Sequence, residues 1–209
     1  MPVKSLDRAK RRLSPILSPL ERASLTLAML EDVLDAAVAA SAWETWVISP
    51  DEAVLEVAAR RGVRPMVEEK PPLSSAVRQA EQEALGAGAD ALAVLLADLP
   101  MVTAGALTEA LRTIGPVVLS PSAEDDGTNL LLRRPPRAVP ARFGRGSYRK
   151  HLDAAAARGL PVAEVDRPEL AFDMDTPHDI ERLLAADPPS RARDVCLDLG
   201  LPARLSVGA

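Results

Sequence analysis

Aromatic side chains are scarce in this sequence of 209 residues, where Phe, Trp and Tyr together make up 2%. Proteins that bind single-stranded nucleic acids stack bases on aromatic rings, and the chain has almost none to offer. It also lacks the basic excess that a phosphate backbone attracts, because its net charge is -5. The composition therefore argues against a nucleic-acid partner and leaves Ala, Val and Leu to build the core.

Cysteine and long apolar runs are equally rare. The single cysteine, Cys196, excludes an internal disulfide and a multi-cysteine zinc site, and we expect a buried, unreactive side chain. The longest apolar run, residues 91–97, is far too short to cross a bilayer. The first residues are followed by charges and not by the apolar stretch of a secretory signal. We therefore expect a cytoplasmic protein with no membrane contact.

Strand-like and helix-like segments alternate along the chain. A capping box from Ser18 to Glu21, with Pro19 at the first helical position, starts a helix that reaches about residue 40. The predicted strands cover residues 45–49, 63–67, 91–97, 116–120, 129–133 and 162–165. The other predicted helices cover residues 51–61, 73–85, 103–113, 147–159 and 177–185. This order predicts an α/β, Rossmann-like fold with a mostly parallel sheet and helices on both faces.

The length favours one domain, which we place at residues 1–186. Residues 187–209 have the pattern of a C-terminal tail with a short helix near 191–199. We expect the first strand of the sheet to be truncated, because a charged loop begins directly after Val3. Residues 125–140 depart from the alternation, and we interpret them as a hairpin or an insertion over the site.

Three aspartates stand where a ligand site is expected. Asp98 follows the apolar run, at the strand end where ligands bind in parallel sheets. Asp173 and Asp175 share one face of an extended segment. Turn formation explains Asp98 about equally well, and helix capping is the alternative for Asp175. Together, the three carboxylates could hold Mg²⁺.

Positive and hydrogen-bonding groups flank the same predicted edge. The loop before the first helix concentrates basic residues: Lys4, Arg8, Lys10, Arg11 and Arg12. This loop is either a solvated surface or a contact for phosphates. The glycines before Ser147 would let backbone N–H groups approach an anion at a helix start. Thr128 and Asn129 follow a tight turn, which could be only a hairpin turn. His151 lies four residues after Ser147, but no oxyanion motif accompanies the pair, which argues against a serine hydrolase.

Five segments in this order resemble one family, the guanylyltransferases that activate phosphoenolpyruvate or 2-phospho-L-lactate in biosynthesis of the deazaflavin coenzyme, factor 420. The segments are P-V-K…A-K-R-R-L (2–13), A-D-L-P (97–100), D-D-G-T-N (125–129), R-F-G-R-G-S…H (142–151) and D-M-D-T-P-H-D (173–179). They cover the chain to about residue 184. Pro72-Leu73-Ser74 departs from the family's G-L-N, so the asparagine's nucleotide contact is not transferred to Ser74.

The resemblance implies a nucleotide-diphospho-sugar transferase fold of the GT-A type, GTP as co-substrate and two Mg²⁺ ions. By matching positions, the metal ligands would be Asp98, Asp173 and Asp175. The acceptor's phosphate and carboxylate would be held by Lys4, Thr128, Gly144 and Ser147. The nucleotide would be bound by Lys10, Arg12 and Asn129, and the catalytic residues would be Lys4 and Asp98.

The expected reaction joins the GMP part of GTP to phosphoenolpyruvate and releases pyrophosphate. An Ala-, Arg- and Pro-rich composition that looks bacterial favours phosphoenolpyruvate as the acceptor, with 2-phospho-L-lactate and 3-phosphoglycerate as alternatives. A cytidylyl- or guanylyltransferase with another acceptor and a non-catalytic nucleotide-binding module are further alternatives. Hand-over of the product to the downstream transferase of the pathway is also conceivable.

Overall fold

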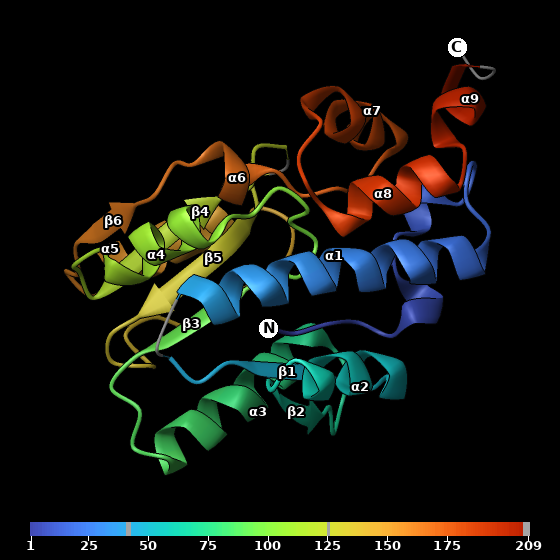
Figure 1. Cartoon of the computed structure of the whole chain (residues 1–209). Helices are drawn as coiled ribbons and strands as arrows, with labels where there is room; N and C mark the ends of the chain where they lie inside the picture. Colours follow the sequence, from blue (N-terminus) through green and yellow to red (C-terminus); the bar gives the residue numbers. More distant parts are fainter. Residues whose placement is uncertain (41–42, 125, 207–209) are drawn as a thin grey trace.

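The computed structural model describes residues 1–40, 43–124 and 126–206, which fold into layers of helices and strands (Figure 1). The strands are β1 (Trp46–Ser49), β2 (Arg64–Val67), β3 (Leu92–Leu95), β4 (Val117–Pro121), β5 (Thr128–Arg133) and β6 (Val162–Glu164). The helices are α1 (Pro19–Ala40), α2 (Glu52–Arg60), α3 (Leu73–Gly86), α4 (Ala104–Arg112), α5 (Ser147–Ala156), α6 (Pro168–Ala171), α7 (Pro177–Ala186), α8 (Arg191–Asp198) and α9 (Leu201–Ser206). The predicted α/β class is confirmed.

The strands form a pair and a larger sheet. β1 and β2 are parallel, and the second sheet has the order β3-β5-β4-β6. Within it, β4 and β6 are parallel, whereas β5 is antiparallel to both of its neighbours. The connection from β4 to β5 is too short for a crossover, so the two strands can pair only as a hairpin. The predicted hairpin is therefore present, but its second strand lies inside the sheet and is not an insertion over the site. Asp125, which the sequence analysis assigned to the start of this region, lies outside the described residues.

The first three residues act as a strand stub beside β1. The backbone N–H of Val3 donates to the carbonyl of Ile48 at 2.9 Å, and that of Ile48 donates to the carbonyl of Met1 at 3.0 Å. The α-amine of Met1 donates to the carbonyl of Trp46 at 2.8 Å. This stub thus pairs in parallel with β1 and fixes where Lys4 leaves the sheet. Beside Met1 lies an apolar cavity of about 340 Å³ between β1, β3, α1 and α4.

Helix α1 joins the two sheets. Its start is the predicted capping box, in which the N–H of Ser18 donates to Glu21 Oε2 at 2.7 Å. Val33 packs into the core of the larger sheet, and Leu30 and Leu34 pack on β1 and α2. Burying each of these leucine side chains contributes about 1.5–3 kcal/mol to the free energy of folding. No helix in the described part of the chain, α1 included, is long and apolar enough to span a membrane.

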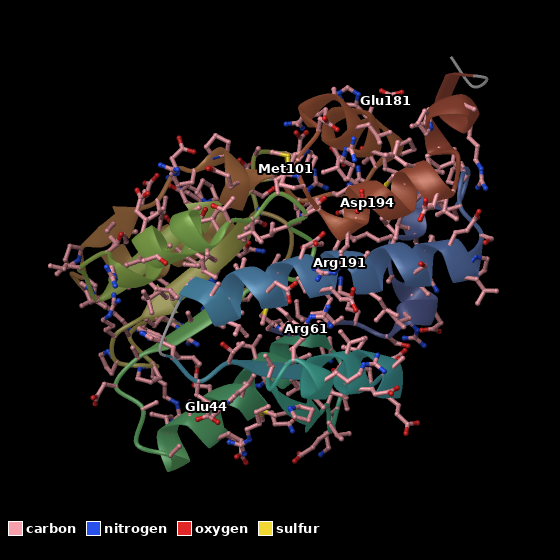
Figure 2. The ribbon with its side chains drawn as sticks, in the orientation of Figure 1. Glu44, Arg61, Met101, Glu181, Arg191 and Asp194 are labelled. Atoms are coloured by element: carbon pink, nitrogen blue, oxygen red, sulfur yellow. The ribbon has the colours of Figure 1, made fainter. Side chains whose placement is uncertain are left out.

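The C-terminal helices pack against α1. The Asp32 carboxylate accepts the backbone N–H groups of Arg191 and Ala192 at 2.9 and 3.0 Å and so caps α8. Figure 2 shows Arg191 and Arg61 reaching α1 from the α8 and α2 sides, and both guanidinium groups pair with Asp35. The short helix predicted in the tail is therefore present, and the described part of the tail is docked. As predicted, Cys196 is fully buried, and burial raises the pKa of its thiol to about 12.

A buried ion pair fastens α3 to β5. The Arg133 side chain has no exposed surface, and its Nη1 donates to Glu81 Oε2 at 2.7 Å. The Glu81 side chain is only 13% exposed. Removing one partner of such a pair leaves a charge without compensation inside the protein.

We expect Glu81→Gln to lower the free energy of unfolding in urea by about 3 kcal/mol. Glu83→Gln, on the same helix, is the matched control. Glu83 pairs with Arg64 where both side chains are about half exposed, so its loss should cost less than about 1 kcal/mol. Equal losses in the two variants would contradict this role of Glu81.

Candidate active site

One pocket of about 370 Å³ lies where β3 and the start of β5 meet the N-terminal loop. All of the site residues predicted from the sequence line this pocket: Lys4, Lys10, Arg12, Asp98, Thr128, Asn129, Gly144, Ser147, Asp173 and Asp175. They come from distant parts of the chain. The fold therefore brings the predicted acidic, basic and hydroxyl groups together.

Backbone contacts explain why the aspartates converge. The N–H of Met174 donates to the carbonyl of Asp98 at 3.1 Å, which joins the two acidic segments directly. Asp179, in the capping box of α7, accepts the N–H of Asp175 at 3.0 Å. Ser122, at the end of β4, donates its hydroxyl to Asp173 Oδ1 at 2.6 Å. The alternative interpretation of Asp175 as a helix cap is wrong, because Thr176 takes the cap position of α7. Only the backbone of Asp175 is bound to the capping box, and its carboxylate lines the pocket.

The ammonium group of Lys10 bridges two of the carboxylates. Its Nζ lies 2.7 Å from Asp98 Oδ2 and 2.8 Å from Asp175 Oδ1, and its side chain is only 6% exposed. Lys10 has a left-handed backbone, with φ 47°, which costs an ordinary residue about 1–3 kcal/mol. The two charged contacts hold it there. A cation therefore already stands between Asp98 and Asp175, and that cation belongs to the protein.

Lys10 also governs the charge states of its neighbours. Burial alone would lower the pKa of Lys10, but the carboxylates of Asp98 and Asp175 outweigh it and raise this pKa. Burial would raise the pKa of Asp175, but Lys10 and Arg12 hold it below its usual value. Asp173 has no cationic partner among the residues that the structure describes. Its pKa is raised by burial and by the nearby charges of Asp98 and Asp175, against the hydrogen bond from Ser122.

The acidic side of the pocket can accept a metal ion. Asp98 Oδ1 is buried and has no hydrogen-bond partner among the described residues, so one ligand atom stands ready. The position of the Lys10 ammonium shows that positive charge is favoured there. Within residues 1–40, 43–124 and 126–206, however, no three acidic, His or Cys side chains are arranged to enclose an ion. The carboxylates therefore have the chemistry of metal ligands, but the Lys10 ammonium lies between two of them in this structure.

A second part of the pocket wall presents neutral hydrogen-bonding groups. Thr128 opens β5, and its Oγ1 lies 3.2 Å from the hydroxyl of Ser147. Ser147 is the first residue of α5 and not its cap, because Gly146 takes the cap position with φ 65°. Gly144 has φ 107°, a backbone that side chains rarely adopt, so the loop over the pocket requires glycine. These groups suit an anion that binds through hydrogen bonds.

The other predicted residues differ in how they are held. Lys4 is exposed at the rim, and Arg12 Nη1 is 4.0 Å from Asp175 Oδ2 with a 68% exposed side chain. Asn129 is buried, and its amide donates to the carbonyls of Leu170 and Ala171 at 3.0 and 3.2 Å. Asn129 thus holds the segment that leads to Asp173, and a nucleotide contact for it stays a prediction.

Arg22 and Ser122 escaped the sequence analysis, which noted His151 only for its spacing from Ser147 and its place in a family motif. Arg22 is buried on α1 and donates to the carbonyls of Ala9 and Leu17, which fixes the loop that carries Lys10. Ser122 orients Asp173, and His151 contacts Thr128. Only the burial of Arg22 left a trace in the sequence, as one cation on an otherwise apolar helical face. Ser74 is exposed at the start of α3, next to Leu73, which lines the pocket.

The comparisons with known proteins point to one family. The family model described as "Guanylyl transferase CofC like" matches residues 1–207. A phosphoenolpyruvate guanylyltransferase of Rubrobacter xylanophilus is 43% identical over 89% of this chain and 92% of its own. A 2-phospho-L-lactate guanylyltransferase of Methanothermobacter thermautotrophicus is 34% identical over 100% of this chain and 93% of its own.

The fold has solved relatives as well. A nucleotidyl transferase from Methanothermobacter thermautotrophicus superimposes with a TM-score of 0.66, covering 88% of this chain and 95% of that one, at 20% identity. This likeness supports the fold of a nucleotidyltransferase. With the match over nearly the whole sequence and the pocket described above, the chain belongs to the family of CofC-like guanylyl transferases and is a nucleotidyltransferase.

Proposed function

We propose that this protein transfers the GMP part of GTP to the phosphate of phosphoenolpyruvate. The observation that carries the proposal is that one pocket is lined both by three aspartates with basic residues and by neutral hydrogen-bonding groups. The higher identity of the relative named for phosphoenolpyruvate than of the one named for 2-phospho-L-lactate supports this acceptor. The product would be enolpyruvoyl-2-diphospho-5'-guanosine, which the next transferase of the pathway would receive.

The proposed step needs no protein nucleophile. An oxygen of the acceptor's phosphate attacks the α-phosphorus of GTP and forms a new P–O bond. The bond from that phosphorus to the bridging oxygen of the β-phosphate breaks, and pyrophosphate leaves with the electron pair. Two anions must approach each other, so the protein must neutralise charge. Lys4, Lys10 and Arg12 line the pocket where the triphosphate and the acceptor would meet.

In this proposal Asp98, Asp173 and Asp175 would bind two Mg²⁺ ions. When bound, the metal would neutralise phosphate oxygens and stabilise the developing charge on pyrophosphate. Lys10 would exchange its carboxylate partners for phosphate oxygens of GTP, which are equally good partners for an ammonium group. Thr128 and the backbone around Gly144 would hold the acceptor, and Ser147 would support them through its hydrogen bond to the Thr128 hydroxyl.

The acceptor is identified by competition. We expect the purified protein, with GTP, Mg²⁺ and equal concentrations of phosphoenolpyruvate, 2-phospho-L-lactate and 3-phospho-D-glycerate, to form mainly the enolpyruvoyl product, as seen by mass spectrometry. CTP in place of GTP should give little product. A dominant lactyl or glyceryl product would identify 2-phospho-L-lactate or 3-phospho-D-glycerate as the acceptor instead. GTP binding without any pyrophosphate release would favour a non-catalytic binding module.

Asp98 provides a test of the acidic wall. We expect Asp98→Asn to lower kcat in a pyrophosphate-release assay by roughly 100- to 1,000-fold, because it removes a charge that acts on the transition state. Asp90→Asn makes the same change at an exposed position beyond the other end of β3 and should leave kcat within about twofold. Near-unchanged turnover of Asp98→Asn would reject its role.

The bridge made by Lys10 gives a test without turnover. Lys10→Met leaves Asp98 and Asp175 facing each other without their cation. We therefore expect the free energy of unfolding of the metal-free protein to fall by about 1–2 kcal/mol. In a protein of this size that lowers Tm by roughly 2–8 °C. Mg²⁺ should restore more stability to Lys10→Met than to the wild type, because the ion can occupy the vacated position.

The control is Arg12→Met, which removes a charge from the same loop where the side chain is mostly exposed. Its Tm should change little with or without Mg²⁺. An equal response of both variants and the wild type to Mg²⁺ would show that Lys10 does not stand in the place of a metal ion.

A further inference from the structure

A buried histidine lies behind the neutral wall of the pocket. His151, on α5, has no exposed surface and does not itself line the pocket. Its Nδ1 is 3.0 Å from Thr128 Oγ1, and its Nε2 is 2.9 Å from the backbone nitrogen of Arg142. Both ring nitrogens are therefore engaged, one with a residue of the pocket and the other with the loop that covers it.

These partners determine which nitrogen carries the proton. The backbone N–H of Arg142 can only donate, so Nε2 must be the acceptor. A neutral imidazole then has its proton on Nδ1, and this N–H donates to Thr128 Oγ1. Burial lowers the pKa of His151 to about 4, and the charges of Arg133, Arg142 and Lys150 act in the same direction. The ring is thus neutral near pH 7, with one fixed tautomer.

The tautomer in turn sets the direction of the Thr128 hydroxyl. A hydroxyl oxygen has two lone pairs and one proton. The Thr128 oxygen accepts one bond from His151 and one from the hydroxyl of Ser147, at 3.2 Å. With Ser147 as the donor of that bond, both lone pairs are used and the Thr128 O–H is left to donate. Since Thr128 lines the pocket, an oxygen of a bound anion is the partner this donor fits.

We propose that His151 is a positioning residue of the acceptor site, which makes Thr128 an obligatory donor toward an anionic oxygen of the acceptor. Through Nε2 it also holds the backbone at Arg142, where the loop with Phe143 and Gly144 begins. The Phe143 ring meets the imidazole edge to face, with centroids 5.5 Å apart. The inference rests on the proposed function, which places the acceptor's phosphate and carboxylate at this wall.

Two substitutions separate the two hydrogen bonds. In His151→Asn, the side-chain NH₂ takes the place of Nδ1 and can still donate to Thr128. In His151→Gln, the longer side chain can present its oxygen to the N–H of Arg142 but has no donor at Thr128. We expect His151→Gln to raise KM for the acceptor roughly tenfold, the effect of about one hydrogen bond. KM for GTP should stay within twofold, and His151→Asn should retain most of the acceptor affinity.

A double-mutant cycle tests whether the effect passes through Thr128. Thr128→Val alone should weaken the acceptor, and adding His151→Gln should then cause little further change, because the bond is already absent. Additive effects, or equal rises of KM for acceptor and GTP in both His151 variants, would overturn the proposal. If the wild type transfers GMP to none of the three acids, the proposed function fails instead, and these outcomes are distinguishable.

The tautomer can be measured without any variant of His151. The sequence holds two histidines, and His178 is exposed, so His178→Gln leaves one imidazole to assign. Nitrogen NMR of the histidine-labelled protein at pH 7 should show a protonated Nδ1 and an unprotonated Nε2. The opposite tautomer, or a ring protonated on both nitrogens, would overturn the proposal even if a His151 variant failed to fold.

Discussion

Negative charge gathered at one edge of a sheet is the constraint on which this structure depends. Asp98, Asp173 and Asp175 are drawn together by the backbone bond between Met174 and Asp98 and by the cap of α7. Carboxylates this close repel each other unless a cation lies among them. Lys10 supplies it, and Arg22 fixes the loop that brings Lys10 there. The N-terminal loop is therefore as much a part of the site as the strand ends.

The two walls of the pocket solve different problems. The acidic wall with its basic loop acts through net charge, which suits a highly charged triphosphate but is screened by salt and sensitive to the ions present. The wall of Thr128, Ser147 and Gly144 acts through fixed dipoles, which bind by direction more than by charge. A pocket built in this way can admit two anions and still hold each in its own place.

Local signals in the sequence were enough for most elements, and the residues predicted for the site all line one pocket, while their roles stay predictions. The capping box at Ser18 and the proline–threonine start of α7 are recorded in consecutive residues, so their helices could be predicted closely. The position of β5 was harder, because a hairpin pattern does not say whether its second strand enters the sheet. Contacts between distant residues, such as Lys10 with Asp98 or His151 with Thr128, leave no periodic pattern and needed the structure.

The pairing of Met1 with β1 has a practical consequence for anyone who produces this protein. The α-amine donates to Trp46 as a strand amide would, burial lowers its pKa to about 5, and an apolar cavity lies beside it. The last residues of a purification tag fused to this end would lie beside β1. They would either extend the pairing with β1 or displace the stub that positions Lys4. The identity of those linker residues thus becomes part of the enzyme's design.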